Sequence, residues 1–261
     1  MSTLPFHKYQ GTGNDFIMVD NRNLHFDARS EALIQRLCHR RFGIGADGLI
    51  LLENADGYDF RMVYFNADGR EGSMCGNGGR CTVKFAQSLG LFDTHTHFLA
   101  VDGPHEARVE GNWVYLKMMD VSEAEQNPEF YFLDTGSPHY VQWINDLENF
   151  DVFQAGRTVR YNDRFREPGT NVNFVEKIGD NQIFVRTYER GVEDETYSCG
   201  TGVTACALVS YLHGMPSPVR IKTLGGELEV SFESNGSGHF RNIYLAGPAE
   251  KVFEGSYAGT L

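Results

Sequence analysis

The stretch Glu71-Gly-Ser-Met-Cys75-Gly-Asn-Gly-Gly-Arg80 has a counterpart in the second half of the chain, Glu195-Thr-Tyr-Ser-Cys199-Gly-Thr-Gly-Val-Thr204. The two cysteines are 199 − 75 = 124 residues apart. The same offset, without a gap, relates other identical residues: Phe60 and Phe184, Tyr64 and Tyr188, Glu71 and Glu195, Gly90 and Gly214. A constant offset of this kind indicates a duplication. We therefore expect two pseudo-symmetric lobes.

Each motif cysteine precedes a glycine-rich turn and a helical pattern that ends at a glycine, Gly90 in the first copy and Gly214 in the second. Both thiols are thus expected at helix N-termini, where unpaired backbone N–H groups and the helix dipole favour a thiolate. The same N–H groups can bind a substrate carboxylate. One copy alone would be equally typical of a structural turn with a small buried cysteine. Two copies in register indicate chemistry on both faces of a single carbon.

The rest of the chain is rich in strand signals and predicts an α+β fold. One further helix is predicted over residues 30–40, with Ser30 as its cap. The polar segment 120–128 lacks apolar periodicity, so we interpret it as the crossover between an N-terminal lobe (1–119, completed by 248–261) and a C-terminal lobe (120–247). Each lobe is expected to be a mainly antiparallel or mixed sheet wrapped around a central helix, with the active site in the cleft between the lobes. The predicted strands cover residues 16–19, 49–52, 60–65, 112–118, 130–133, 140–144, 172–175, 183–188, 219–223, 227–232 and 242–245.

Composition favours a cytoplasmic enzyme. The chain has 261 residues, with 23 Lys and Arg against 35 Asp and Glu, and its net charge of −12 argues against nucleic-acid or membrane partners. Five cysteines without a disulfide-scaffold spacing suit a reducing compartment. Residues 1–13 do not resemble a signal peptide, and the most apolar helical stretch, 203–212, is too short to span a bilayer.

Two other patterns resemble a nucleotide-binding site and a metal site but do not fit either. Residues 43–48 match the dinucleotide fingerprint G-x-G-x-x-G, but here a helix precedes the motif and a strand follows, which reverses the required order. The cysteines and histidines show no spacing typical of a metal site, so no metal is expected. Cys81 and Cys206 are expected to pack inside helices as small apolar residues.

Several strings together resemble the diaminopimelate epimerase family. They occur in the family's order and cover nearly the whole chain: Gly11-Thr-Gly-Asn-Asp-Phe16, Phe65-Asn-Ala-Asp-Gly69, Cys75-Gly-Asn-Gly-Gly-Arg80, Glu189-Arg-Gly191 and Cys199-Gly-Thr-Gly202. The resemblance implies a two-lobed homodimer that interconverts LL- and meso-2,6-diaminopimelate for lysine and peptidoglycan precursors. It also implies that neither pyridoxal phosphate nor a metal takes part.

The resemblance also assigns roles to individual residues. Inversion at carbon requires proton removal on one face and delivery on the other, which a thiolate and a thiol can perform. Cys75 and Cys199 are this pair, with the acid role usually given to the first and the base role to the second. The remaining implied residues are His139 and Glu189 as catalytic helpers; Asn14, Asn66, Asn171, Glu189 and Arg190 as substrate-binding side chains; and Gly76, Asn77, Gly200 and Thr201 as backbone donors to the α-carboxylate.

The chain departs from the commonest family pattern in three places. Gly48 and Ser137 stand where many relatives have glutamine and asparagine, and the interval from Glu189 to Cys199 is one residue longer. Two other functions remain open at this point. One is a two-cysteine racemase of another amino acid, similar to proline racemase, although Arg190 and the asparagines favour a substrate with a second polar end. The other is a non-catalytic thiol redox or ligand-binding protein in which the two cysteines form a switch.

Overall fold

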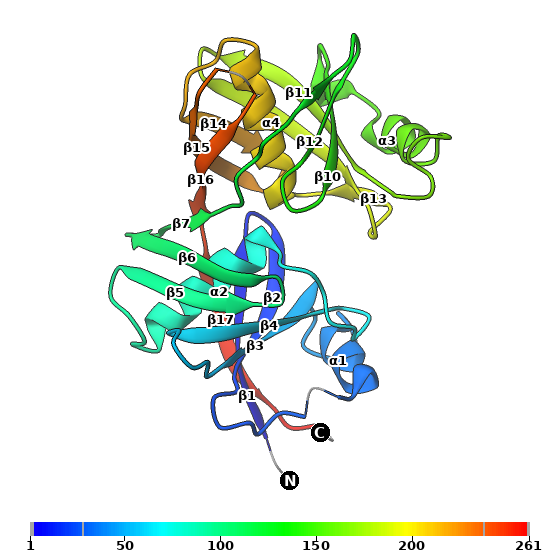
Figure 1. Cartoon of the computed structure of the whole chain (residues 1–261). Helices are drawn as coiled ribbons and strands as arrows, with labels where there is room; N and C mark the ends of the chain where they lie inside the picture. The colour runs from blue at the N-terminus through cyan, green and yellow to red at the C-terminus, as the bar shows by residue number, and fades with distance from the viewer. Residues whose placement is uncertain (1–2, 28, 237, 260–261) are drawn as a thin grey trace. The chain divides into compact units, whose positions relative to one another are not determined.

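The computed structural model describes residues 3–27, 29–236 and 238–259. The chain forms two compact units, Met1–Leu116 with Gly247–Leu261 and Lys117–Ala246. Each unit is a mixed sheet around one buried helix, α2 in the first and α4 in the second (Figure 1). The fold class is therefore α+β, as the sequence predicts.

In the first unit, strands pair in the order β17-β1-β2-β3-β4-β5-β6-β7. The β2–β3 and β4–β5 pairs are parallel and the others are antiparallel. Its elements are β1 Leu4–Gly11, β2 Asn14–Asp20, α1 Glu31–Cys38, β3 Gly48–Glu53, β4 Phe60–Asn66, α2 Gly76–Ser88, β5 His95–Ala100, β6 Gly103–Glu110, β7 Trp113–Lys117 and β17 Glu250–Tyr257.

The second unit repeats this plan. Strands pair in the order β8-β9-β10-β11-β12-β14-β15-β16, with β10–β11 and β12–β14 parallel, and β13 pairs with β12. Its elements are β8 Glu125–Gln126, β9 Tyr131–Asp134, β10 Pro138–Trp143, the 3-10 helix η1 Leu147–Asn149, α3 Val152–Arg160, β11 Asn171–Gly179, β12 Gln182–Glu189, β13 Asp194–Thr196, α4 Gly200–Leu212, β14 Val219–Thr223, β15 Gly226–Ser234 and β16 Phe240–Pro248.

The 124-residue offset holds in the hydrogen-bond register as well as in the sequence. Phe16 pairs with Gly48 between β2 and β3, and Tyr140 pairs with Val172 between β10 and β11; both partners differ by 124 (140 − 16 and 172 − 48). Helices α2 and α4 have 13 residues each, and their starts also differ by 124 (200 − 76). The two units are thus pseudo-symmetric in topology.

The central helices are buried because the sheet of each unit packs around them. Helix α4 is apolar on all faces, which is typical of a helix without a solvent side. Val203, Leu208 and Val209 have no exposed surface, and burying each such side chain contributes about 1.5–3 kcal/mol. A shorter helix covers the other sheet face: α1 packs Ile34 and Leu37 against β2 and β3, and α3 packs beside β11 and β12.

The predicted helix starting after Ser30 is confirmed, and the Ser30 side chain accepts a hydrogen bond from the backbone N–H of Leu33. Residues 120–128, interpreted from the sequence as the crossover, lie in the second unit; they contain β8, and Val121 pairs with Phe240. Helix α3 was not predicted. Its nine residues alternate polar and apolar side chains too briefly to give a clear period, although Asp151 caps it through the N–H of Gln154.

Candidate active site

Both motif cysteines occupy the residue that precedes a central helix. Cys75 and Cys199 have extended backbone conformations (φ −108° and −116°), and the first intrahelical bonds are donated by Gly79 and Val203, at 2.7 and 2.9 Å. The three N–H groups before each donor therefore have no partner within the helix. Neither cysteine side chain caps its own helix start. Each unit thus presents a thiol beside a row of backbone N–H groups suited to a carboxylate.

In the first unit, a hydrogen-bond acceptor faces the thiol. The Asn14 Nδ2 donates to the carboxylate of Asp47 (2.7 Å), which can only accept when ionised. The Asn14 Oδ1 must then lie on the opposite side, where it is 3.7 Å from the Cys75 Sγ and 3.4 Å from the Asn77 Nδ2. An acceptor at this position favours the protonated S–H form of Cys75.

A buried arginine supports the contact between Asn14 and Asn77. The Arg80 side chain has no exposed surface, and its Nη2 donates to the Asn77 Oδ1 (3.0 Å) and the Thr12 Oγ1 (3.2 Å). These bonds orient the Asn77 amide so that its Nδ2 reaches Asn14. Burial lowers the pKa of Arg80 to about 10, so the guanidinium stays charged at neutral pH and attracts a Cys75 thiolate. The cation thus opposes the effect of the Asn14 acceptor.

In the second unit, hydroxyl groups connect the thiol to a buried histidine. The Cys199 Sγ lies 3.5 Å from the Thr201 Oγ1, which lies 3.2 Å from the Ser137 Oγ. The Ser137 Oγ in turn is 3.0 Å from the His139 Nε2. Burial, followed by the nearby charge of Arg190, lowers the pKa of His139 to about 3 against the opposing effect of Asn173. The imidazole is therefore neutral at physiological pH.

The other residues expected at the site lie at strand ends. The Asn171 Oδ1 accepts from the backbone N–H of Arg190 (2.9 Å), and the Arg190 Nη1 donates to the carbonyl of Pro168 (3.2 Å). The Glu189 carboxylate accepts from the Thr196 hydroxyl (2.9 Å). In the first unit, Asn66 ends β4. Of these side chains, Asn171 is linked to the start of helix α4 through Ser137 and Thr201, by contacts of 3.2 Å each.

The position of Gly48 is filled by a tyrosine ring. A Cβ at residue 48 would lie 2.5 Å from the Tyr64 Cε2, so the residue must be glycine for this packing. The Tyr64 hydroxyl donates to the Asn66 Oδ1 (2.9 Å). The aromatic ring of the neighbouring strand β4 therefore occupies the space of a side chain at this position.

Three residues of these networks were not predicted: Asn173, Asp47 and Arg80. The repeat itself points to Asp47, because its counterpart is Asn171 (171 − 47 = 124). The period of two along β11 places Asn173 on the same strand face as Asn171 and so could have indicated it. No simple pattern marks Arg80, since a charged residue in a helix ordinarily indicates an exposed face.

The remaining three cysteines are unsuited to acid–base chemistry. Burial raises the pKa of Cys38 and of Cys81 to about 12, and it raises that of Cys206 well above its usual value. The described part of the chain contains no group of three or more His, Cys, Asp or Glu side chains that could hold a metal ion. Within the same part, none of the helices has the length and apolar character needed to cross a membrane.

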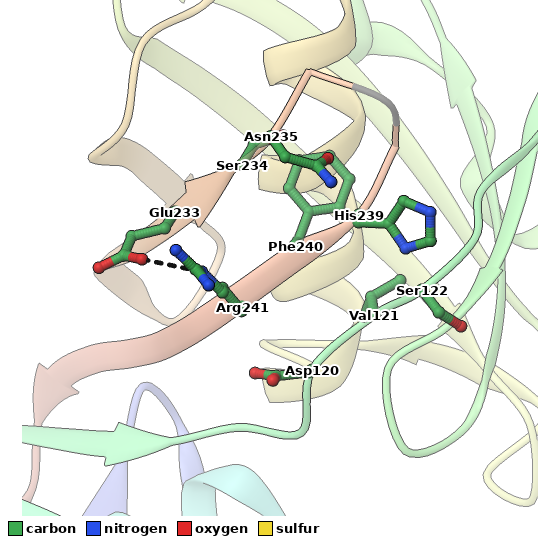
Figure 2. A pocket seen from close by; sticks show the side chains of 9 residues that line it. All are labelled: Asp120, Val121, Ser122, Glu233, Ser234, Asn235, His239, Phe240 and Arg241. Atoms are coloured by element: carbon green, nitrogen blue, oxygen red, sulfur yellow. Dashed lines mark hydrogen bonds and ion pairs between the residues drawn. The ribbon is translucent and has the colours of Figure 1, made fainter.

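The second unit also has an open pocket of about 640 Å³ beside β16, where Glu233 and Arg241 form an ion pair (3.1 Å; Figure 2). Neither motif cysteine lines it, and its only histidine among the described residues, His239, is exposed. Its lining residues are Asp120, Val121, Ser122, Glu233, Ser234, Asn235, His239, Phe240 and Arg241. This pocket is separate from the two thiol groups.

The chain is similar to known proteins over most of its length. The model of the diaminopimelate epimerase family matches residues 6–119 and 131–252. The chain is 52% identical over 254 residues to the diaminopimelate epimerase of Flavobacterium psychrophilum (96% of this chain, 99% of the relative). It is 45% identical over 257 residues to that of Chlorobaculum tepidum (94% and 98%).

Solved structures of lower identity share the fold. A PhzF-family phenazine biosynthesis protein from Bacillus anthracis aligns with a TM-score of 0.76 at 15% identity (99% of this chain, 100% of that one). A hydroxyproline epimerase from Agrobacterium vitis, with bound trans-4-hydroxy-L-proline, aligns with a TM-score of 0.72 at 14% identity (98% and 92%). The match to the family model over most of the length, with relatives at up to 52% identity, shows that this chain belongs to the diaminopimelate epimerase family.

Proposed function

We propose that this chain interconverts LL- and meso-2,6-diaminopimelate with a pair of thiols, in the biosynthesis of lysine and peptidoglycan precursors. The observation that carries the proposal is the placement of Cys75 and Cys199 at the starts of two equivalent buried helices, 124 residues apart. Membership of the family supplies the substrate. The activity for which the relatives are named, diaminopimelate epimerase, supports this assignment.

The reaction is a proton exchange at one α-carbon. The thiolate of one cysteine removes the α-hydrogen as a proton, and the electron pair stays on the carbon and spreads toward the carboxylate. The thiol of the other cysteine delivers its own proton to the opposite face, which inverts the centre and exchanges the roles of the two sulfurs. Backbone N–H groups of Gly76, Asn77, Gly200 and Thr201 bind the carboxylate and stabilise the charge that develops there.

The polar side chains recognise the rest of the substrate. Asn14, Asn66 and Asn171 can donate to a carboxylate and accept from an ammonium group. Arg190, which is exposed at the end of β12, provides a planar fork for the distal carboxylate, and Glu189 accepts from an ammonium group. His139 contributes as a neutral N–H donor rather than as a proton carrier, because burial keeps its pKa near 3.

We further propose a cytoplasmic homodimer that needs no cofactor. The five cysteines are free thiols, which supports a reducing compartment. Strand β17 exposes Val252 (57%) and Phe253 (46%), an apolar surface that a second copy could cover. Light scattering of the purified protein, compared with a Val252→Asp variant, tests the assembly; a wild-type monomer would contradict it.

One assay tests the activity directly. Purified, reduced protein without added cofactor is incubated with LL-diaminopimelate, and the isomers are separated by chiral chromatography. The expected result is a mixture of the LL and meso isomers. An unchanged LL sample would contradict the proposal. If a parallel incubation with L-proline showed conversion instead, a proline racemase-like activity would be favoured.

A further inference from the structure

A continuous chain of hydrogen bonds in the second unit ends at the Cys199 sulfur. It connects the side chains of Asn173, His139, Ser137, Thr201 and Cys199, and Asn171 joins it at Ser137. Hydroxyl and imidazole groups can point their protons either way. The amide groups of Asn171 and Asn173 cannot, because each forms a hydrogen bond with a backbone group that can only donate or only accept. The direction of the whole chain can therefore be worked out from its ends.

The first end is Asn173, which has no exposed surface. Its amide faces the carbonyl oxygen of Tyr140 at 2.9 Å, and since a carbonyl only accepts, the atom there is the Nδ2 donor. The Thr187 hydroxyl donates to the Asn173 Oδ1 (3.0 Å). The same Nδ2 lies 3.1 Å from the His139 Nδ1, which must then accept. A neutral imidazole with an accepting Nδ1 carries its proton on Nε2, so Nε2 donates to the Ser137 Oγ.

The second end is Asn171. The backbone N–H of Arg190 can only donate, so the atom that it meets at 2.9 Å is the Oδ1 of Asn171. The Asn171 Nδ2 then donates on the opposite side, to the carbonyl of Pro138 (3.3 Å) and to the Ser137 Oγ (3.2 Å). Ser137 thus receives two hydrogen bonds, one from His139 and one from Asn171.

Two incoming bonds occupy both lone pairs of the Ser137 oxygen. Its own proton is left for the Thr201 Oγ1 at 3.2 Å, and Thr201, having accepted there, directs its O–H to the Cys199 Sγ at 3.5 Å. A donor at the sulfur stabilises the thiolate more than the thiol.

We propose that Ser137 is a positioning residue for the base form of Cys199: it collects the two N–H donations and turns the Thr201 hydroxyl toward the sulfur. The repeat gives the first unit no equivalent, since the counterpart of Ser137 is Gly13 (137 − 124 = 13). The consequence for turnover rests on the proposed function, whereas the effect on Cys199 itself does not.

A substitution at Ser137 removes none of the other ionisable groups around this chain. They are His139 on β10, Glu189 at the end of β12 with Arg190 after it, and Cys206 further along α4. Arg190 acts electrostatically on His139, and Cys206 on Cys199. A change in Cys199 ionisation that follows removal of one neutral hydroxyl therefore reports the hydrogen bond.

The test measures thiolate formation at each cysteine in the free, reduced enzyme. Iodoacetamide alkylation is followed against pH, and mass spectrometry of the peptides reads Cys75 and Cys199 separately. In Ser137→Ala, the Cys199 profile should move to higher pH and its alkylation at neutral pH should slow about threefold to tenfold, the effect of one lost hydrogen bond. The Cys75 profile should not move. Ser137→Thr should restore the Cys199 profile, and Ser122→Ala, an exposed serine of the same unit, should leave it unchanged.

A Cys199 profile that superimposes on the wild type in a folded Ser137→Ala protein would overturn the proposal, as would an equal shift at Cys75. If Ser137→Ala fails to fold by circular dichroism, Thr201→Val and Thr201→Ser decide the matter, because only the second retains the hydroxyl next to the sulfur. Ultraviolet thiolate absorbance in a Cys75→Ala background gives a second readout, since the pKa values of Cys38, Cys81 and Cys206 are raised out of the neutral range by burial. None of these measurements needs epimerase activity. A protein without that activity would refute the proposed function but would leave the proposed role of Ser137 unaffected.

Discussion

The two cysteines share a backbone setting but meet opposite hydrogen-bonding partners. Cys75 faces the Asn14 Oδ1, an acceptor fixed in place by the Asp47 carboxylate. Cys199 faces the Thr201 hydroxyl, whose proton is directed to the sulfur. The hydrogen-bonding partner favours a thiol at Cys75 and a thiolate at Cys199, whereas the buried Arg80 attracts a thiolate at Cys75.

The comparison shows what the duplication has kept and what has diverged. Both units keep the helix start, whose N–H groups are suited to a carboxylate. The supporting side chains differ at equivalent positions: the buried Arg80 corresponds to Thr204, and the ion-paired Asp15 corresponds to the neutral His139 (204 − 80 = 139 − 15 = 124). The attraction between Arg80 and a Cys75 thiolate supports the proposed role of this thiol as base in the reverse reaction.

Replacing either motif cysteine by alanine is expected to have the largest effect. Each single change removes the acid or the base for one face, so the rate of epimerisation should fall by at least roughly 10²–10⁴-fold. The double variant should be little worse, because the two residues act as a unit. Isomer interconversion by chiral chromatography measures all three. A near-normal rate in either single variant would show that the two half-sites are not equivalent.

Replacing the third residue of helix α2 or of helix α4 by alanine should lower the stability of the protein to different extents. At Gly202 a Cβ would lie 2.4 Å from the Asn173 Oδ1, a buried atom with little freedom to move. At the equivalent Gly78 it would meet the flexible ends of Ile50 (3.1 Å) and Met62 (3.3 Å). We expect Gly202→Ala to lower the free energy of unfolding by about 1–3 kcal/mol and Gly78→Ala by less than about 1 kcal/mol. Urea denaturation checks this, and equal losses would contradict the packing described around Asn173.

A pH-dependent effect on stability is expected from His139. Its pKa is lowered from 6.5 to about 3 in the folded chain, so between these values the unfolded state binds a proton that the folded state does not. Stability is therefore fully present above pH 6.5 and is lost as the pH falls toward 3, by about 1.4 kcal/mol per pH unit from this group. His139→Gln should remove that part of the pH dependence in urea denaturation between pH 5 and 7. An identical slope in both proteins would show that the imidazole is not buried as a neutral group.

Much of the fold could be predicted because short-range sequence signals mark the ends of helices and the turns in both copies of the repeat. Ser30, Gly90 and Gly214 mark helix ends through capping and through positive φ (74° and 86° for the glycines), and the turns before Phe60, Ile183 and Glu227 join antiparallel strands. The strands that were missed are β1, β5, β6, β8, β13 and β17. Strand β17 is exposed along nearly its whole length, so long-range pairing with β1 rather than its own pattern makes it a strand.

The candidate site divides in the same way. The cysteines, the glycines and Asn14 could be identified because they lie in motifs. The direction of the hydrogen bonds could not, because it depends on the Tyr140 carbonyl and the Arg190 N–H, backbone groups that carry no signal in the sequence. The packing of Tyr64 against Gly48 is likewise set by strand register.

The central claim is that the two thiols act from opposite faces of one carbon, and the origin of the delivered proton tests it most directly. LL-diaminopimelate is incubated with the enzyme in deuterated water, and the isotope content of each isomer is followed by mass spectrometry at low conversion. Two bases predict that early meso product carries deuterium at the inverted carbon while the remaining LL substrate keeps its hydrogen. Early product that retains the original hydrogen would mean that a single base serves both faces, and the two-thiol account would be wrong.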